Sequence, residues 1–398
     1  MTPARSLPAA GLFAGIGGLE LGLRAAGHPC SLLCEIDDGA RAVLRARFAD
    51  TPLHDDIRTL RSLPRETRLV AAGFPCQDLS QAGQTRGISG ARSGLVGEIF
   101  RLLRARPVPW VVLENVPFML QLARGEALRV VLGQLEALGY SWAYRVVDAR
   151  AFGLPQRRER VYIVASLEED PRRVLFADEA PADPVERAPS GRSSRVRRPA
   201  CGFYWTEGIR GLGWAVDCVP TLKGGSSVGV PSPPAIWMED GAIVTPHLRD
   251  AERMQGFAPD WTLPAEQVVR SGHRWKLVGN AVSVPVATWL GGRLAAPAEP
   301  ILVDAEPIAD GARWPRAAWN VGAGRYANGL SVWPRREPAQ SLASFLRDDP
   351  KPLSQRATAG FLERTARSSL EFPAGFLDAM RDHLLRMQSS TVADPRVA

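Results

Sequence analysis

Hydrophobic and polar positions follow two alternating patterns over the first 166 residues. Short apolar runs predict buried strands, and the segments between them repeat apolar residues with helical spacing. The strands are expected at Ala9–Phe13, Ser31–Ile36, Leu69–Phe74, Trp110–Val116, Trp142–Val147 and Val161–Ala165, and the helices at Leu19–Ala26, Gly39–Phe48, Leu95–Ala105 and Glu126–Leu138. This alternation predicts an α/β fold with a doubly wound parallel sheet. Binding residues are expected where the strands end.

The pattern changes at about residue 168. Pro, Gly, Ser and Arg dominate as far as residue 232, and the periodicity fades, which predicts a loop-rich module instead of a continuation of the sheet. Order returns with LRDAERMQGF and with a helix over Val284–Leu294 that begins near Pro285. Beyond residue 297 a connector rich in Pro and Ala leads to about 100 residues without an assignable pattern.

Composition narrows the class of protein. With 398 residues, 45% hydrophobic and 23% charged, the chain has ordinary globular composition and is not a disordered, collagenous or disulfide-rich protein. It has neither a membrane-spanning run nor a secretory signal, so we expect a cytoplasmic protein. Five cysteines without paired spacing predict no metal site. A net charge of +7 suits a polyanionic partner but does not prove one.

A glycine-rich turn, Gly11–Gly18 (GLFAGIGG), joins the first strand to the first helix. It could bind a dinucleotide, a nucleoside cofactor or nothing, but Leu21 replaces the last glycine of the dinucleotide fingerprint and disfavours a nicotinamide. Glu35 ends the second strand, where such folds place an acid against ribose hydroxyls. Asp56 could accept a hydrogen bond from an adenine amino group. Both could also be solvated acids.

Chemistry-bearing residues also follow later strands. Cys76 projects from the end of a strand beside a proline, and could act as a thiolate nucleophile or be structural. Glu114 ends the next strand, and Arg158 and Arg160 share one side of a strand entry at period 2. A thiol, an acid and an arginine pair at one edge of a sheet could attack and protonate an electron-poor ring beside a nucleoside cofactor.

Read in order, GLFAGIGG, CEIDD, GFPCQDLS, ENV, QRRER, RDAERMQGF and LVGNAVSVP resemble the motif set of the cytosine-5 DNA methyltransferases over residues 8–297. The resemblance implies a Rossmann-like, S-adenosyl-L-methionine-dependent methyltransferase domain with a mostly irregular or β target-recognition domain. The implied domains are 1–167 (catalytic), 168–275 (target recognition), 276–297 (returning to the catalytic domain) and 298–398 (unknown role).

The resemblance also implies catalytic roles. Cys76 would attack carbon 6 of a flipped-out cytosine, Glu114 would hold ring nitrogen 3 and the amino group, and Arg160 would hold the carbonyl oxygen. Arg158 would support the loop or a phosphate. Thiolate addition makes carbon 5 nucleophilic enough to take a methyl group from a sulfonium, and a donor at ring nitrogen 3 stabilises the charge that forms.

The cofactor implied by the resemblance is S-adenosyl-L-methionine, with no metal. Its expected pocket residues are Phe13, Gly15, Ile16, Gly17, Gly18, Glu35, Ile36, Asp56, Ile57, Pro75, Leu95, Asn280 and Val282. The last two require the late GNAVSVP segment to fold back onto the first domain. Gly11 departs from the family, where many relatives carry an acid, and this leaves recognition of the methionine amine by that position open.

The implied partner is double-stranded DNA. Residues 77–92 are expected to close over the flipped base, and the irregular module is expected to read the sequence through loops that enter a groove. The DNA-contacting residues expected on this basis are Gln77, Ser80, Arg92, Gln156, Thr221, Leu222, Lys223, Gly224 and Gly225. Asn115 and Gln156 would orient their neighbours.

Two alternatives remain at this stage. One is a tRNA cytosine-5 methyltransferase of the same fold, disfavoured by Phe74 where that subgroup usually has proline. The other is a catalytically silent DNA-binding regulator, disfavoured by the intact catalytic residues. We expect a monomeric bacterial or viral enzyme, either paired with a restriction endonuclease or solitary.

Overall fold

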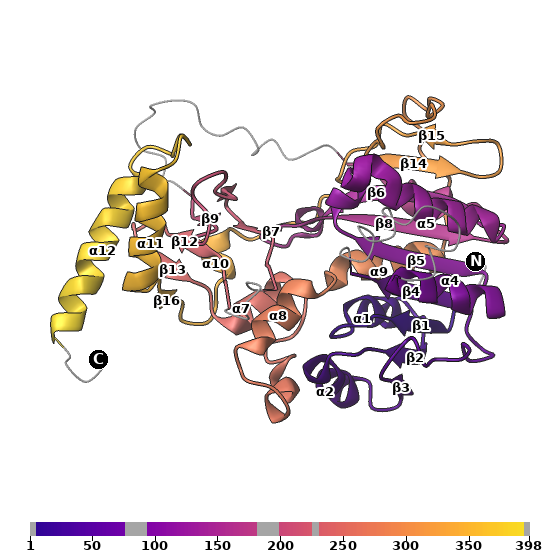
Figure 1. Cartoon of the computed structure of the whole chain (residues 1–398), viewed down its shortest axis with the longest axis horizontal. Helices are drawn as coiled ribbons and strands as arrows, with labels where there is room; N and C mark the ends of the chain where they lie inside the picture. The colour runs from indigo at the N-terminus through magenta and orange to yellow at the C-terminus, as the bar shows by residue number, and fades with distance from the viewer. Residues whose placement is uncertain (1–4, 76–93, 181–198, 225–230, 394–398) are drawn as a thin grey trace.

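The computed structural model describes residues 5–75, 94–180, 199–224 and 231–393. Two units lie side by side along the long axis of the molecule (Figure 1). The larger unit is built on a nine-stranded sheet, and the smaller one on a five-stranded sheet. The amino terminus lies in the larger unit, and the carboxyl terminus follows the helices of the smaller unit (Figure 1).

The large sheet has the strand order β15-β14-β6-β8-β5-β4-β1-β2-β3. Its strands are β1 (Ala9–Leu12), β2 (Cys30–Cys34), β3 (Leu53–His54), β4 (Leu69–Gly73), β5 (Trp110–Asn115), β6 (Ser141–Asp148), β8 (Glu159–Ser166), β14 (Ala317–Asn320) and β15 (Tyr326–Ala327). The five strands β3, β2, β1, β4 and β5 are parallel, whereas β8 is antiparallel to both β5 and β6. The carboxyl ends of β1, β2, β4 and β5 therefore meet the amino end of β8 at one edge.

Helices cover both faces of this sheet, and because it is covered, its central strands are almost entirely apolar. The elements around it are α1 (Gly18–Ala25), α2 (Asp38–Arg47), α4 (Leu95–Ala105), η2 (Pro117–Leu120), η3 (Leu122–Gly125), α5 (Glu126–Ala137), η4 (Ala149–Phe152), α6 (Arg172–Leu175) and α9 (Val284–Ala295). Helices α1 and α9 pack closely because Gly22 and Gly291 have no side chain: a Cβ at Gly22 would lie 2.4 Å from the Cβ of Ala287.

The smaller unit contains the antiparallel sheet β10-β9-β12-β13-β16. Its elements are β9 (Cys201–Phe203), β10 (Ala215–Val216), β12 (Ala235–Trp237), β13 (Ile243–Thr245), α7 (Leu248–Met254), η6 (Leu263–Gln267), α8 (His273–Asn280), α10 (Leu342–Phe345), β16 (Lys351–Pro352), α11 (Gln355–Ala366) and α12 (Phe376–Ala393). A short parallel pair, β7 (Gln156–Arg157) and β11 (Val219–Pro220), joins the two units. An aromatic cluster of Phe203, Trp214, Trp237, Phe361 and Phe376 attaches the last two helices to the small sheet.

The last 100 residues contribute to both units. Strand β14 pairs with β6 and widens the large sheet, and further along the chain β16 pairs with β13 in the small sheet. The buried guanidinium of Arg145 fixes the first part of this segment, because it donates hydrogen bonds to the carbonyl oxygens of Ser331 and Asp178 and pairs with Glu179. The carboxyl-terminal segment therefore ties the two sheets together.

The α/β fold predicted from the sequence is confirmed. Each strand and helix expected in the first 166 residues is present with ends within two residues of the expected ones, and α9 contains Pro285 in its first turn, as predicted. Within the described residues, no helix is long and apolar enough to cross a membrane, and no group of His, Cys, Asp or Glu is arranged to hold a metal ion.

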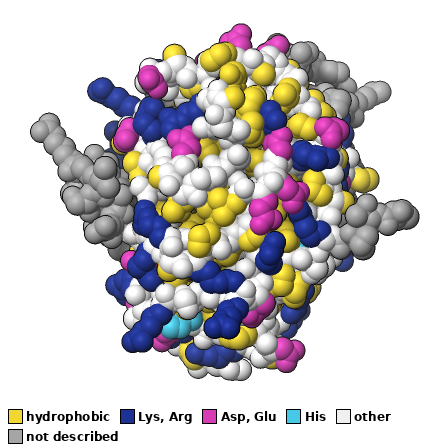
Figure 2. Space-filling model, turned by 90° about the vertical axis from the view of Figure 1, so that its right-hand side faces the viewer, with side chains coloured by type: hydrophobic (Ala, Val, Ile, Leu, Met, Phe, Trp, Pro, Cys, Tyr) yellow, Lys and Arg dark blue, Asp and Glu magenta, His cyan; other side chains and the backbone are white. Residues whose placement is uncertain are grey.

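The face of the large unit that looks away from the small unit carries side chains of both charges. On this face, Lys and Arg side chains are spread among acidic and apolar side chains (Figure 2). Three further arginines, Arg157, Arg160 and Arg316, line a cavity near the start of β8.

Candidate active site

A cavity of about 700 Å³ lies at the edge where β1, β2, β4 and β5 end. This volume is within the range that holds a cofactor-sized ligand. The cavity is lined by Phe13, Gly15, Cys34, Glu35, Ile36, Asp37, Ala40, Asp56, Ile57, Gly73, Phe74, Pro75, Leu95, Glu114, Asn115, Val116, Arg158, Arg160, Lys276, Leu277, Gly279 and Asn280. These residues come from both units, as an active site between two domains requires.

The glycine-rich turn forms one wall of the cavity. Gly15 and Gly17 have φ values of +55° and +84°, which glycine adopts without strain, and Phe13 also has a positive φ of +54°. Glu35 accepts hydrogen bonds from the amide of Gly15 (2.7 Å) and from the amide of Asp37 (2.8 Å). Burial nevertheless raises the pKa of Glu35. This carboxylate therefore fixes the turn and stands inside the cavity.

The next wall combines an exposed apolar side chain with fixed charges. Ile36 is 59% exposed although it lines the cavity, so its flat apolar surface is available to a ligand. Asp37 caps α2 through the amide of Ala40 and also contacts His273 (2.9 Å). On the same side, Arg58 pairs with Asp56 (2.6 Å) and lowers the pKa of that carboxyl to about 2. Asp56 is therefore an acceptor at neutral pH.

Glu114 and Arg160 form a buried ion pair at the back of the cavity. The Nε of Arg160 lies 3.1 Å from Oε1 of Glu114, and the two side chains are only 11% and 10% exposed. Burial raises the pKa of Glu114, and the two neighbouring arginines oppose that shift only in part. The carboxyl group therefore keeps its proton to a higher pH than an exposed glutamate does. Such a group can donate a hydrogen bond to a ring nitrogen.

Arg158 is buried and holds backbone from the small unit and α8. Its guanidinium donates hydrogen bonds to the carbonyl oxygens of Leu222 (3.3 Å), Gly279 (3.2 Å) and Ala281 (2.7 Å). Burial and the charge of Arg160 lower its pKa to about 9. Arg158 was expected to support either a loop or a phosphate. These contacts are of the first kind, because they hold neighbouring backbone segments.

Asn115 and Gln156 are also buried and bonded to backbone. The Asn115 side chain donates to the carbonyl oxygen of Phe74 (3.0 Å), which fixes the end of β4. Gln156 donates to Met254 O (2.9 Å) and accepts from the amide of Leu222 (3.0 Å). Gln156 thus orients its neighbours, which was one of its two expected roles. With no exposed surface, it cannot contact DNA in this arrangement.

The carboxyl group of Glu20 fills the space above Gly11. A Cβ at Gly11 would lie 2.1 Å from Oε1 of Glu20, so any larger residue at position 11 would displace this side chain. Glu20 is 1% exposed, and neither carboxyl oxygen has a hydrogen-bond partner elsewhere among the described residues. Burial raises its pKa to about 8. Glu20 of α1 therefore places a carboxyl group beside Gly11, the strand position at which many relatives carry an acid.

Most of the expected cofactor residues lie together. The expected residues that line the cavity are Phe13, Gly15, Glu35, Ile36, Asp56, Ile57, Pro75, Leu95 and Asn280, together with the catalytic candidates Glu114, Arg158 and Arg160. Ile16, Gly17, Gly18 and Val282 are not among the residues that line it. A Cβ at Gly18 would lie 2.3 Å from the carbonyl oxygen of Val282, so the GNAVSVP segment does fold back onto the first domain.

Sequence reasoning missed several lining residues. Asp37 was visible in the CEIDD motif as the N-cap of the following helix, a signal that could have placed it at the same strand end. Lys276 and Leu277 precede the GNAVSVP motif by only a few residues, so the return of that motif to the cavity carries them with it.

The remaining expected DNA-contacting residues fall into four groups. Gln77, Ser80, Arg92 and Gly225 lie outside the described residues, and so does the expected catalytic residue Cys76. Leu222 is 2% exposed and belongs to the core of the small unit. Thr221 and Lys223 are accessible, and Lys223 pairs with Glu207 and stacks on Tyr204. Gly224 packs against Asn280, where a Cβ would lie 2.6 Å from its side-chain oxygen.

Comparisons with known proteins agree with this geometry. The sequence profile of the family "C-5 cytosine-specific DNA methylase" matches residues 9–194. Type II methyltransferase M2.BsuMI of Bacillus subtilis (strain 168) is 48% identical over 379 residues, which is 93% of this chain and 96% of that protein. Type II methyltransferase M.NgoBI of Neisseria gonorrhoeae is 30% identical over 69% of this chain and 89% of its own length.

A solved structure shows the same fold at low sequence identity. The crystal structure of the S. pombe Dnmt2 methyltransferase matches with a TM-score of 0.53 at 19% identity, over 72% of this chain and 98% of that chain. The family expected from the seven ordered motifs is confirmed, and the chain is a DNA (cytosine-5-)-methyltransferase of the type whose reaction proceeds through a covalent adduct. It belongs to the C-5 cytosine-specific DNA methylases.

Proposed function

We propose that the 700 Å³ cavity binds S-adenosyl-L-methionine and that Cys76, Glu114 and Arg160 act on a cytosine held beside it. The observation that carries this proposal is the buried Glu114–Arg160 pair, which stands at one end of a cavity whose other end presents Glu35 and the exposed Ile36. One end suits a polar ring, and the other suits a nucleoside.

The cavity residues fit the proposed cofactor. A carboxylate bonded to backbone amides keeps further lone pairs for ribose hydroxyls, so Glu35 can bind ribose while it fixes the turn. Ile36 offers an apolar face to adenine, and ionised Asp56 can accept a hydrogen bond from the adenine amino group. When bound, the cofactor supplies a methyl group on a positively charged sulfur.

The residues of this chain then prepare the cytosine. The Cys76 thiolate adds to carbon 6, and protonated Glu114 donates a hydrogen bond to ring nitrogen 3, which stabilises the charge that this addition creates. Arg160 holds Glu114 in place and offers its remaining N–H groups to the carbonyl oxygen. Carbon 5 takes the methyl group and loses its proton, and the thiolate leaves.

The proposed substrate is duplex DNA bound between the two units. The base must leave the stack to reach a buried acid, which costs a few kcal/mol. The part of the smaller unit within residues 168–275 would read the sequence, and it contains the accessible residues Thr221, which donates a hydrogen bond to Arg157 beside the catalytic cavity, and Lys223. Because its relatives are named Type II methyltransferases, a restriction endonuclease is the proposed functional counterpart.

Trapping of the covalent adduct tests the proposal directly. Methylation mapping of DNA from an expressing host identifies the site, and a duplex with 5-fluorocytosine at that site is then incubated with protein and S-adenosyl-L-methionine. We expect a denaturation-resistant complex with the wild type and none with Cys76→Ser, while Cys30→Ser, at a half-buried position in β2, still forms it. Methyl transfer by Cys76→Ser at the wild-type rate would overturn the assignment.

A parallel experiment distinguishes DNA from RNA. Labelled S-adenosyl-L-methionine is supplied with either plasmid DNA or total tRNA. We expect label in the plasmid, because the relatives that cover most of this chain are Type II methyltransferases. Label in tRNA alone would show that the chain uses the methylase fold on RNA instead.

A further inference from the structure

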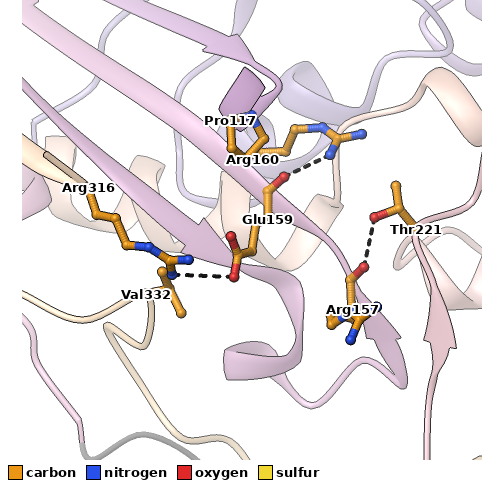
Figure 3. Close-up of a pocket in the computed structure, with 7 residues that line it drawn as sticks. All are labelled: Pro117, Arg157, Glu159, Arg160, Thr221, Arg316 and Val332. Carbon is orange, nitrogen blue, oxygen red and sulfur yellow. Dashed lines mark hydrogen bonds and ion pairs between the residues drawn. The ribbon is translucent and has the colours of Figure 1, made fainter. Parts of the chain in front are cut away.

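A second cavity, of about 470 Å³, adjoins the catalytic one, and we call it the basic cavity. It is lined by Pro117, Arg157, Glu159, Arg160, Thr221, Arg316 and Val332 (Figure 3). Three of these seven side chains are arginines and one is a carboxylate. Arg160 lines both cavities, so the basic cavity lies directly beside the catalytic one.

The topology of the large sheet brings these arginines together. Strands β8 and β14 both pair antiparallel with β6, so both begin at the edge where β5 ends. Arg160 stands at the start of β8, Arg157 ends β7 two residues before β8 begins, and Arg316 directly precedes β14. The backbone of Arg316 is fixed there, because its carbonyl oxygen accepts a hydrogen bond from the amide of Val146 (2.8 Å). A carboxyl-terminal residue therefore stands beside the catalytic motif.

Two of the three guanidinium groups are available to a ligand. Arg316 is 61% exposed, and its Nη1 lies 3.4 Å from Glu159, a distance and exposure at which an ion pair contributes little (Figure 3). Arg157 contacts no carboxylate within the parts of the chain that the structure describes, and its side chain lines the cavity. Its backbone is held in place, because its carbonyl oxygen accepts a hydrogen bond from Thr221 (2.8 Å). Arg160 is committed to Glu114.

We propose that the basic cavity binds one backbone phosphate of the DNA beside the target cytosine, held by Arg316 and Arg157. A planar guanidinium binds a phosphate through two parallel hydrogen bonds. Such bonds to a phosphate can replace the weak contact between Arg316 and Glu159. This proposal depends on the proposed function, because it places the phosphate next to the cytosine that Arg160 and Glu114 hold. It gives residue 316 of the carboxyl-terminal segment a role in DNA binding.

The salt dependence of DNA binding tests the proposal. Fluorescence anisotropy measures the Kd of a labelled 30-base-pair duplex with the mapped site at increasing NaCl for the wild type, Arg316→Ala, Arg157→Ala and Arg316→Lys. Each lost phosphate contact should reduce the slope of log Kd against log[NaCl] by about 0.9. We expect that reduction in Arg316→Ala, a several-fold higher Kd, and a KM for DNA that changes more than kcat; Arg316→Lys should recover much of the slope.

Arg65→Ala is the matched control. Arg65 is exposed but precedes β4, at the opposite edge of the sheet, so its loss should leave slope and Kd at wild-type values. A slope of Arg316→Ala equal to those of the wild type and of Arg65→Ala would overturn the proposal. This outcome is separable from failure of the proposed function, in which wild-type protein binds the duplex but transfers no methyl group.

A set of duplexes that each carry one neutral methylphosphonate locates the contact. One substitution beside the target cytosine should weaken binding of the wild type as much as Arg316→Ala does, and it should weaken Arg316→Ala no further. If each single substitution weakens Arg316→Ala and the wild type equally, Arg316 does not contact a phosphate and the proposal is wrong. Equal melting temperatures of all variants exclude a loss of folding as the cause.

Discussion

Arg157 and Arg158 are neighbours in the chain, but they stand in different surroundings. Arg158 is buried in the catalytic cavity and bonded to three carbonyl oxygens, whereas Arg157 lines the basic cavity without a carboxylate partner in the described part of the chain. The same contrast separates the two cavities as wholes. In the catalytic cavity, Glu114 and Arg160 are nine-tenths buried and paired, and in the basic cavity Arg316 is largely exposed.

This difference indicates how each cavity contributes. A buried charge with fixed partners is positioned before the substrate arrives, so its loss changes the rate of the reaction or the stability of the fold. An exposed and weakly paired arginine can move to an incoming anion, so its loss changes affinity and salt dependence. Substitutions in the two cavities should therefore have different kinetic and thermodynamic signatures.

The largest effect is expected from Glu114→Gln. An amide of the same shape cannot protonate ring nitrogen 3, so we expect kcat to fall about 10²–10³-fold with little change in the Kd for DNA. Because burial raises the pKa of Glu114, the protonated form is lost only as the pH rises through that raised value, and wild-type kcat should fall there. Single-turnover methyl transfer measured against pH checks both expectations. A variant with wild-type kcat would show that the proton of Glu114 is not used.

The next largest effect separates the neighbouring arginines by stability. Arg158→Ala leaves three buried carbonyl oxygens without their donor, so we expect a loss of about 3 kcal/mol in the free energy of unfolding. Arg157→Ala is the matched control and should unfold like the wild type, because its side chain donates no hydrogen bond to backbone among the described residues. Urea unfolding followed by circular dichroism measures both. Equal stabilities of the two variants would contradict the contrast between the two cavities.

A smaller effect concerns Glu20, the buried acid without a partner. Its pKa is raised from 4.5 to about 8, so the folded protein holds a proton that the unfolded chain releases, and this contribution to stability is lost as the pH rises from about 4.5 through 8. Glu20→Gln cannot lose a proton there. Its melting temperature should match the wild type at pH 5 and exceed it by about 3 °C at pH 8.5. The exposed control Glu371→Gln should have the melting temperature of the wild type at both pH values. If Glu20→Gln does so too, the pKa of Glu20 is not raised by burial.

The two cavities also differ in how much of them the sequence could predict. Glu35, Glu114 and Arg160 follow or begin strands with clear apolar patterns, so the rule that binding residues stand at strand ends placed them before the structure was known. Arg157 lies within the same QRRER motif, yet nothing in the motif indicates that it lines the basic cavity and not the catalytic one. The positions of Glu35, Glu114 and Arg160 could therefore be predicted from the local pattern of apolar residues alone.

Arg316 could not be predicted, because no local pattern marks it. It owes its position to β14, a strand of four residues that pairs with β6, so that Ala318 lies opposite Tyr144, 174 residues away in the chain. The small sheet is similar, since β9, β10, β12, β13 and β16 are two or three residues long and interrupted by proline and glycine. Strands this short show no periodicity, and tertiary pairing determines them.

The smallest effect is expected where backbone and catalytic carboxyl meet. Gly73 pairs with Glu114 across β4 and β5, and a Cβ there would lie 3.3 Å from Oε2 of Glu114 and 3.6 Å from Val282. Gly73→Ala should therefore shift the carboxyl by a few tenths of an ångström and lower kcat about threefold, since catalysis is sensitive to such displacement. Gly133→Ala is the control: it stands in open space within α5, so it should leave kcat unchanged and add about 0.5–1 kcal/mol of stability. Equal kcat for Gly73→Ala and the wild type would mean that the catalytic cavity tolerates movement of its acid, and that its charges are less firmly positioned than those distances imply.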